Sequence, residues 1–210
     1  MESYRLEGQT FVIDDYDRKP AFSSFLPGLA GVKGIPLWTF YTNRGQGMNS
    51  FGIDNKGNAI MEFNSANTAF ENTQVKGFRT FLKIDGEYYE PFFKYEKEAK
   101  RQMRMNKNSF KIIETNEKYG IEVTVNYYVL PNESIGALVR QVSVKNIGDS
   151  AKEVQVIDGL PKIITYGIAN GEFKEMSNLF KSWADIRNLE NKVPYYTLRA
   201  STKDSAEVSD

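Results

Sequence analysis

Cysteine and histidine are both absent from the 210-residue chain. Without cysteine it has no disulfide, thiol nucleophile or thiolate metal site, a composition that suits a reducing cytosol. Without histidine it lacks the commonest general base and the commonest ligand of transition metals. Ser-His-Asp, Cys-His and zinc-water chemistries are therefore excluded for this chain alone, which leaves carboxylate, lysine or tyrosine chemistry, or none.

The chain also has no excess of charge of either sign, with 27 Lys plus Arg against 27 Asp plus Glu. Nucleic-acid-binding domains usually carry a basic excess, so no nucleic-acid partner is expected. One local basic group comprises Lys97, Lys100, Arg101 and Arg104. A solvated helix or loop face is the favoured interpretation of such a group.

Long apolar runs are missing as well. The segment from Met1 to Arg5 leads into no apolar core, which argues against a signal peptide. No window approaches about 18 consecutive apolar residues, so neither a membrane span nor a membrane partner is expected. We expect a soluble, cytoplasmic protein.

Aromatic residues, turn residues and alternating strands are what the chain does contain. Residues 121–130 alternate between an apolar and a polar face, which predicts a strand with one buried face. Further strands at 137–145 and 152–157 follow after short turns, which predicts an antiparallel meander of neighbours. Less regular strands are predicted at residues 10–13, 37–42, 49–54, 60–64, 78–84, 87–93 and 110–115.

One segment departs from the β pattern. Phe173, Met176, Phe180 and Trp183 recur at helical spacing, which predicts an amphipathic helix over residues 172–187 that plugs the sandwich or covers an edge. A further strand is expected at 196–200, and the chain then stops without a cap or polar tail. We therefore predict a mainly β, antiparallel sandwich with one amphipathic helix, forming a single domain over residues 1–210 that continues into a longer polypeptide.

Three acidic residues near the N-terminus suggest oxygen ligands for a hard cation. Asp14, Asp15 and Asp17 lack the glycine and the distal glutamate of a calcium loop, so a solvated loop is favoured. In that loop we expect Asp17 to pair with Arg18 or Lys19. No metal site and no cofactor are predicted.

The densest aromatic and polar cluster occupies residues 36–47. It contains Trp38, Tyr41, Arg44 and Gln46, with Glu62 in a following segment. Sugars bind to aromatic faces and to fixed polar groups, so these residues form a candidate substrate-binding or interface site, with no catalytic residue among them. The favoured alternative places the aromatics in the core, with Arg44 and Glu62 as a partly buried ion pair.

Five stretches of the sequence carry a family resemblance. They are YDRKPAFSSFLPGLAG (16–31), IPLWTFYTNRGQGMNSFGIDNKGNAIMEFN (35–64), DGLPKIITYG (158–167), MSNLFKSW (176–183) and NLENKVPYYTLRAST (188–202). They resemble the N-terminal domain of the glycoside phosphorylases grouped in glycoside hydrolase family 94. The run TNRGQGMNSFG (42–52) stands where cellobiose phosphorylases carry a run like GGYSF, which favours the members that act on 1,2-β-oligoglucans.

The resemblance implies an antiparallel β-supersandwich followed by linker helices and a catalytic (α/α)6 barrel. In that barrel an aspartate acts as general acid, and inorganic phosphate, the co-substrate, attacks with inversion to release glucose 1-phosphate. The acid and the phosphate-binding residues belong to the barrel, so no residue of this chain inherits a catalytic role. The implied role of the domain is to provide homodimer contacts and a wall beside the active-site mouth, where the β-glucan oligosaccharide binds.

Three classes of function remain open from the sequence. The first is the non-catalytic domain of a phosphorylase, inactive without its barrel. The second is a free-standing carbohydrate-binding sandwich that uses Trp38, Tyr41, Arg44 and Gln46 as its platform. The third is an interaction module that docks a partner helix on the apolar stripe between Phe173 and Ile186.

Overall fold

Antiparallel strands dominate the chain. The computed structural model describes residues 3–46, 48–53, 57, 61, 64–164 and 169–199. Within these ranges the fold is mainly β and every pair of named strands is antiparallel, which confirms the predicted fold class.

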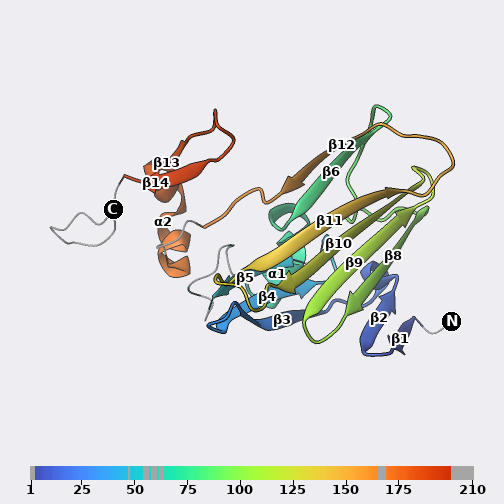
Figure 1. Cartoon of the computed structure of the whole chain (residues 1–210), viewed down its shortest axis with the longest axis horizontal. Coiled ribbons are helices and arrows are strands. Elements are labelled where there is room, and N and C mark those ends of the chain that lie inside the picture. The colour runs from blue at the N-terminus through green and yellow to red at the C-terminus, as the bar shows by residue number, and fades with distance from the viewer. Residues whose placement is uncertain are drawn as a thin grey trace.

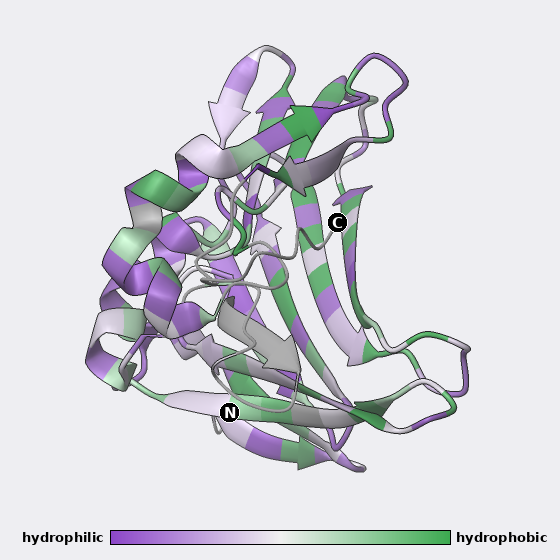
Figure 2. Cartoon of the chain, turned by 90° about the vertical axis from the view of Figure 1, so that its left-hand side faces the viewer, coloured by the Kyte–Doolittle hydropathy of each residue, from purple (hydrophilic) through white to green (hydrophobic). Residues whose placement is uncertain are grey.

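The larger layer is a six-stranded sheet with the order β1-β2-β8-β9-β10-β11. Its strands are β1 (Tyr4–Glu7), β2 (Thr10–Asp14), β8 (Ala99–Met105), β9 (Ser109–Asn116), β10 (Ile121–Val129) and β11 (Leu138–Asn146). Successive side chains point to opposite faces, so Val123 and Val125 of β10 are buried whereas Thr124 between them is partly exposed. Figure 2 shows this alternation as stripes of hydrophobic and hydrophilic residues along the strands.

Two three-stranded sheets form the opposite layer, in the orders β12-β6-β7 and β3-β4-β5. Their strands are β3 (Ser23–Ala30), β4 (Ile35–Thr42), β5 (Met48–Ile53), β6 (Arg79–Ile84), β7 (Glu87–Tyr89) and β12 (Val154–Gly159). Side chains of both sheets meet the inner face of the six-stranded sheet in one apolar core, which includes Leu26, Tyr41, Leu82, Phe110 and Tyr127. The protein is therefore a sandwich whose second layer is divided in two (Figure 1).

The predicted three-strand meander is wrong at its last step. The strands predicted at 121–130 and 137–145 are β10 and β11, and they pair. The strand predicted at 152–157 is β12, which pairs with β6 in the other layer instead of with β11. Asp158 on β12 binds both Thr80 of β6 and Arg140 of β11, so β12 joins the layers rather than extending the larger sheet.

The described chain has two α-helices, α1 (Ala66–Lys76) and α2 (Asn170–Trp183), and a short 3-10 helix, η1 (Tyr16–Arg18). The helix predicted over 172–187 is α2, but it ends at Trp183 because the next four residues form β13 (Ala184–Arg187), which pairs with β14 (Tyr195–Leu198). Phe173 and Phe180 of α2 are buried in a small cluster of their own. In Figure 1 α2 and this hairpin lie to one side of the sandwich. Neither α1 nor α2 has the length and apolarity that crossing a bilayer requires.

The predicted solvated basic face is wrong at one residue. Lys100 is exposed and pairs with Glu117, but Arg101 on β8 points into the sandwich and is only 5% exposed. It binds Asp17, so the expected pairing of Asp17 with Arg18 or Lys19 is also wrong. A strand that alternates its side chains turns Arg101 inward whatever its charge, and the carboxylates that face it compensate for burial.

Candidate functional site

The predicted aromatic pair lies on both faces of one strand. Trp38 and Tyr41 are three residues apart on β4, so their side chains point in opposite directions. Tyr41 belongs to the core, where its ring stacks on Phe110 at 4.3 Å and its hydroxyl donates to the sulfur of Met105 at 2.9 Å. Trp38 is half-buried beside the exposed ring of Phe25, 6.1 Å away. The structure therefore does not bring Trp38 and Tyr41 together on one platform.

Arg44 and Gln46 follow β4 and hold neighbouring segments in place. The guanidinium of Arg44 donates to the backbone carbonyl of Asp17 at 2.5 Å and lies 4.7 Å from the centre of the Phe70 ring on α1. Gln46 is buried, and its amide donates to the hydroxyl of Thr80 at 2.8 Å. Both side chains thus tie the β4–β5 connection to other elements. Glu62, and with it the expected Arg44–Glu62 pair, lies outside the described residues.

Arg140 is the centre of a polar cluster that joins both layers. Its guanidinium donates to the Tyr127 hydroxyl at 3.0 Å and also binds Asp158 and Gln46. The same group lies 4.7 Å from the ring centre of Phe78. Burial alone would lower the pKa of Arg140, but Tyr127 and Asp158 raise it, so the side chain stays cationic. This cluster contains one predicted site residue, Gln46, and its contacts are structural.

Tyr127 in this cluster makes the stability depend on alkaline pH. Burial, opposed by Arg140, raises the pKa of Tyr127 from 10.0 to about 12. A tyrosine with a higher pKa in the folded state stabilises the fold below its unfolded pKa, and this stabilisation is lost as the pH rises through the folded pKa. Between the unfolded and the folded pKa of Tyr127, the wild-type protein should lose roughly 1.4 kcal/mol of unfolding free energy per pH unit. Tyr127→Phe should not show this loss.

Urea denaturation at about pH 9 and about pH 11 would measure that difference, because these values bracket the onset of the loss. Absorbance at the tyrosinate band gives a second readout, since Tyr127→Phe should delete one late ionisation. Equal pH dependence of the two proteins would contradict the assignment of the raised pKa to Tyr127.

A second buried polar network was not predicted from the sequence. Glu114 on β9 is fully buried and accepts a hydrogen bond from Arg101 Nε at 2.6 Å. Its other oxygen accepts from the hydroxyl of Tyr89 on β7. Burial, and then the negative charge of Glu114, raise the pKa of Tyr89, which keeps that hydroxyl protonated and donating. A signal was present in the sequence, because Glu114 continues the inward row of Phe110 and Ile112 at a spacing of two.

The same network anchors the connection between β7 and β8, residues 90–98. Glu114 Oε2 accepts from the backbone N–H of Phe92 at 2.7 Å, and Arg101 Nη2 donates to the carbonyl of Lys94 at 2.5 Å. Phe92 is buried and has φ of 64°, a conformation that is costly for a bulky residue and persists only when the surroundings impose it. Hydrogen bonds from Glu114 on β9 and Arg101 on β8 thus hold the β7–β8 connection in place.

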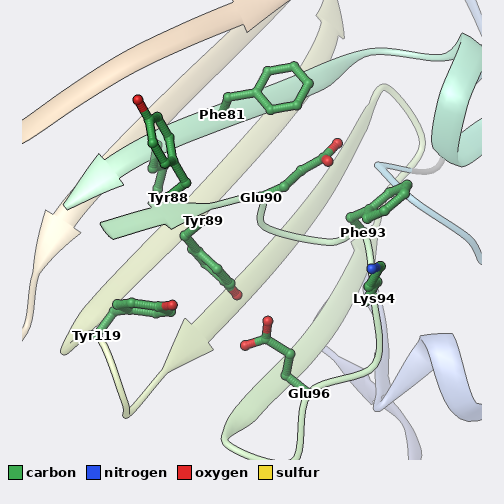
Figure 3. A pocket seen from close by; sticks show the side chains of 9 residues that line it. Phe81, Tyr88, Tyr89, Glu90, Phe93, Lys94, Glu96 and Tyr119 are labelled. Carbon is green, nitrogen blue, oxygen red and sulfur yellow. The ribbon is translucent and has the colours of Figure 1, made fainter. Parts of the chain in front are cut away.

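This fixed connection forms one wall of a cleft of about 360 Å³ beside β7. Five of its nine lining residues are aromatic, and two are glutamates. The aromatic residues are Phe81, Tyr88, Tyr89, Phe93 and Tyr119. Figure 3 shows Tyr89 and Glu96 pointing toward each other, with Glu90 and Phe93 on the other side of the opening. None of these residues belongs to the cluster predicted from the sequence.

Clusters of acidic side chains are the remaining candidates for a metal site in a chain without cysteine and histidine. Among the described residues there is no group of three or more acidic side chains that could hold a metal ion. The carboxylates of Glu114 and Asp158 are already engaged by arginines. The aromatic faces and hydrogen-bonding groups that line the cleft are able to contact a ligand.

Comparison with known proteins adds no family assignment. A scan against protein-family models and a search of curated proteins both find no match to this chain.

Proposed function

We propose that the chain is the non-catalytic N-terminal domain of an inverting β-glucan phosphorylase of the glycoside hydrolase family 94 type. In this proposal the enzyme cleaves β-1,2-linked gluco-oligosaccharides with inorganic phosphate and releases glucose 1-phosphate in the cytoplasm. The acid and phosphate-binding groups belong to a downstream (α/α)6 barrel. The present domain shapes the mouth of the active site and contributes to a homodimer interface.

The observation that supports this proposal is the exposure of large apolar side chains on β12 and around the β13–β14 hairpin. Within the described residues β12 pairs only with β6, and Val156 and Ile157 on it are 49% and 73% exposed. Beyond it, Leu189, Val193 and Tyr195 on and beside the β13–β14 hairpin are also exposed. Exposed apolar side chains on neighbouring segments can be covered by an interacting surface. A supporting domain that packs against a barrel of the same polypeptide needs such a surface.

The state of the buried charged groups fits a supporting role. Glu114 forms an ion pair with Arg101, and Asp158 forms one with Arg140. Both buried arginines therefore neutralise carboxylates of the sandwich itself. A general acid of a glycoside phosphorylase must instead present a protonated carboxyl to a glycosidic oxygen. The proposal therefore places that step outside this domain and expects no turnover by the chain alone.

The test compares the 210-residue chain with the longest polypeptide encoded by the reading frame that contains it. Both are incubated with glucose 1-phosphate and with either β-1,2-linked or β-1,4-linked acceptors, and phosphate release is measured. We expect release only by the longer polypeptide and only with β-1,2-linked acceptors. Turnover by the chain alone would contradict the non-catalytic role, and inactivity of the longer polypeptide with every acceptor would contradict the phosphorylase assignment.

A further inference from the structure

The cleft beside β7 has the size and the lining of a small-molecule site. Its volume of about 360 Å³ lies within the range of roughly 300–1,000 Å³ that is usual for such sites. Its walls come from β6, β7, the β7–β8 connection and the turn between β9 and β10. Segments that are distant in the sequence therefore converge on one opening (Figure 3).

The aromatic lining combines accessible and anchored rings. Tyr88 is 82% exposed and Phe81 is 38% exposed, so both offer ring surface to a ligand. Tyr89 is buried and packs against Tyr119 with 4.6 Å between ring centres. Its hydroxyl is fixed by Glu114 and by the amide of Asn116, which donates to it at 2.9 Å. The back of the cleft is thus held in place while its rim presents ring faces.

Arg79 organises the opposite wall. Its guanidinium makes a two-pronged contact with Glu90, at 2.7 Å from Nε to Oε1 and 2.9 Å from Nη2 to Oε2. It also lies 4.7 Å from the ring centre of Phe81 and 5.4 Å from that of Phe93. One cation therefore fixes two aromatic rings and one carboxylate of the lining. Bidentate pairs of this kind restrain both groups.

The polar groups of the cleft favour hydroxyl donors over charged ligands. Glu90 is neutralised by Arg79 yet retains acceptor capacity, because each carboxylate oxygen accepts more than one hydrogen bond. Glu96 accepts from Asn116 through Oε2 at 3.0 Å, and its Oε1 has no hydrogen-bond partner among the described residues. Lys94 is the cation that lines the opening beside these two carboxylates. The residues that line the cleft thus carry two carboxylates and one cation, while Lys83 and Lys118 lie against the rings of Tyr88 and Tyr119.

We infer that this cleft binds a neutral oligosaccharide that spans the edge strand β7, with one sugar ring against the exposed faces of Tyr88 and Phe81 and hydroxyl groups donating to Glu90 and, on the Tyr89 side of β7, to Glu96. Sugar rings present C–H patches that pack on aromatic faces, and their hydroxyls need fixed polar partners. The rigid connection that carries Glu90 and Glu96 reduces the ordering cost of binding. The inference uses residues of this chain alone and goes beyond the proposed function, which assigns no sugar contact to β7.

Isothermal titration of the full 210-residue chain tests this site, with sophoro-oligosaccharide, cellohexaose and laminarihexaose as neutral probes and oligogalacturonate as the anionic probe. We expect at least one neutral probe to bind and the anionic probe not to bind. Tyr88→Ala should weaken binding of the neutral probe by about tenfold, because it removes the most exposed ring face of the cleft. Glu96→Gln should weaken it to a similar extent, because one hydroxyl acceptor becomes a donor.

Matched controls lie on the same connection. Tyr95 is 63% exposed and Glu98 is exposed, but neither lines the cleft, so Tyr95→Ala and Glu98→Gln should leave the affinity unchanged. Circular dichroism of every variant confirms that it is folded. Equal loss in Tyr88→Ala and Tyr95→Ala, binding of the anionic probe alone, or no binding of any neutral probe by the folded chain would each overturn the inference. Oligosaccharide binding and phosphate release are measured in separate experiments. A negative titration would therefore overturn the binding site without deciding the phosphorylase proposal.

Discussion

Glu114→Ala is expected to lower the free energy of unfolding by about 3–5 kcal/mol, the usual cost of removing one partner of a buried ion pair. The side chain of Glu114 is 0% exposed and that of Arg101 is 5% exposed, so the guanidinium would lose its closest buried carboxylate. The backbone N–H of Phe92 and the hydroxyl of Tyr89 would lose their acceptor as well. Urea denaturation followed by circular dichroism measures the change.

Two further variants separate charge from geometry. Glu114→Gln keeps the shape of the side chain but removes its charge, and should fall between the wild-type protein and Glu114→Ala. Glu117, three residues further on, pairs with Lys100 at the surface, where water screens the pair. Glu117→Ala should therefore leave the denaturation midpoint almost unchanged. If the alanine variants at 114 and 117 lower the midpoint equally, the buried pair does not have the role assigned to it.

Phe110→Ala should lower the free energy of unfolding by about 3–5 kcal/mol, as usual for an aromatic deleted from a core. Phe110 is completely buried and stacks on Tyr41 at 4.3 Å and on Tyr127 at 5.7 Å between ring centres. These three rings come from β9, β4 and β10, so the cavity would open where the layers of the sandwich meet. The midpoint of thermal or urea unfolding reports the loss.

Phe81 provides the control for this substitution. Its ring is 38% exposed and contacts the guanidinium of Arg79, an interaction that contributes about 0.5–1 kcal/mol at exposed sites. Phe81→Ala should consequently cost far less stability than Phe110→Ala. Similar losses in the two variants would show that the core does not depend on the stack between the layers.

Most strands could be predicted from the sequence, including less regular ones such as β4, which was expected at 37–42 and spans Ile35–Thr42, whereas β1, β3 and β8 could not. β10 was evident because its apolar and polar residues alternate over the whole strand. β3 contains Pro27 and Gly28, which indicate a turn, but it is an edge strand of its sheet, where proline is tolerated. α1 was missed because only Ala69 and Thr73 of its residues are buried, which leaves no apolar stripe.

The candidate site was harder to predict because proximity in sequence was used in place of proximity in space. Trp38 and Tyr41 are neighbours along the chain, yet strand geometry sends them to opposite faces. The residues that do converge, such as Phe81, Glu96 and Tyr119, come from three separate segments. No periodicity links such positions. Only the pairing of strands, which the sequence leaves open, brings them to one cleft.

The position of β12 also matters for handling the isolated chain. Its outer edge carries backbone donors and acceptors with no partner strand in the described structure, and its middle residues are Val156 and Ile157. Such an edge is a template for a strand from another molecule, and apolar side chains make that pairing adhesive. Charged side chains near an edge strand can prevent such pairing, but Lys152 is already paired with Asp85 and Asp158 with Arg140. These two residues therefore protect the edge only weakly. We therefore expect a concentrated preparation of the isolated chain to form intermolecular β-sheet through β12.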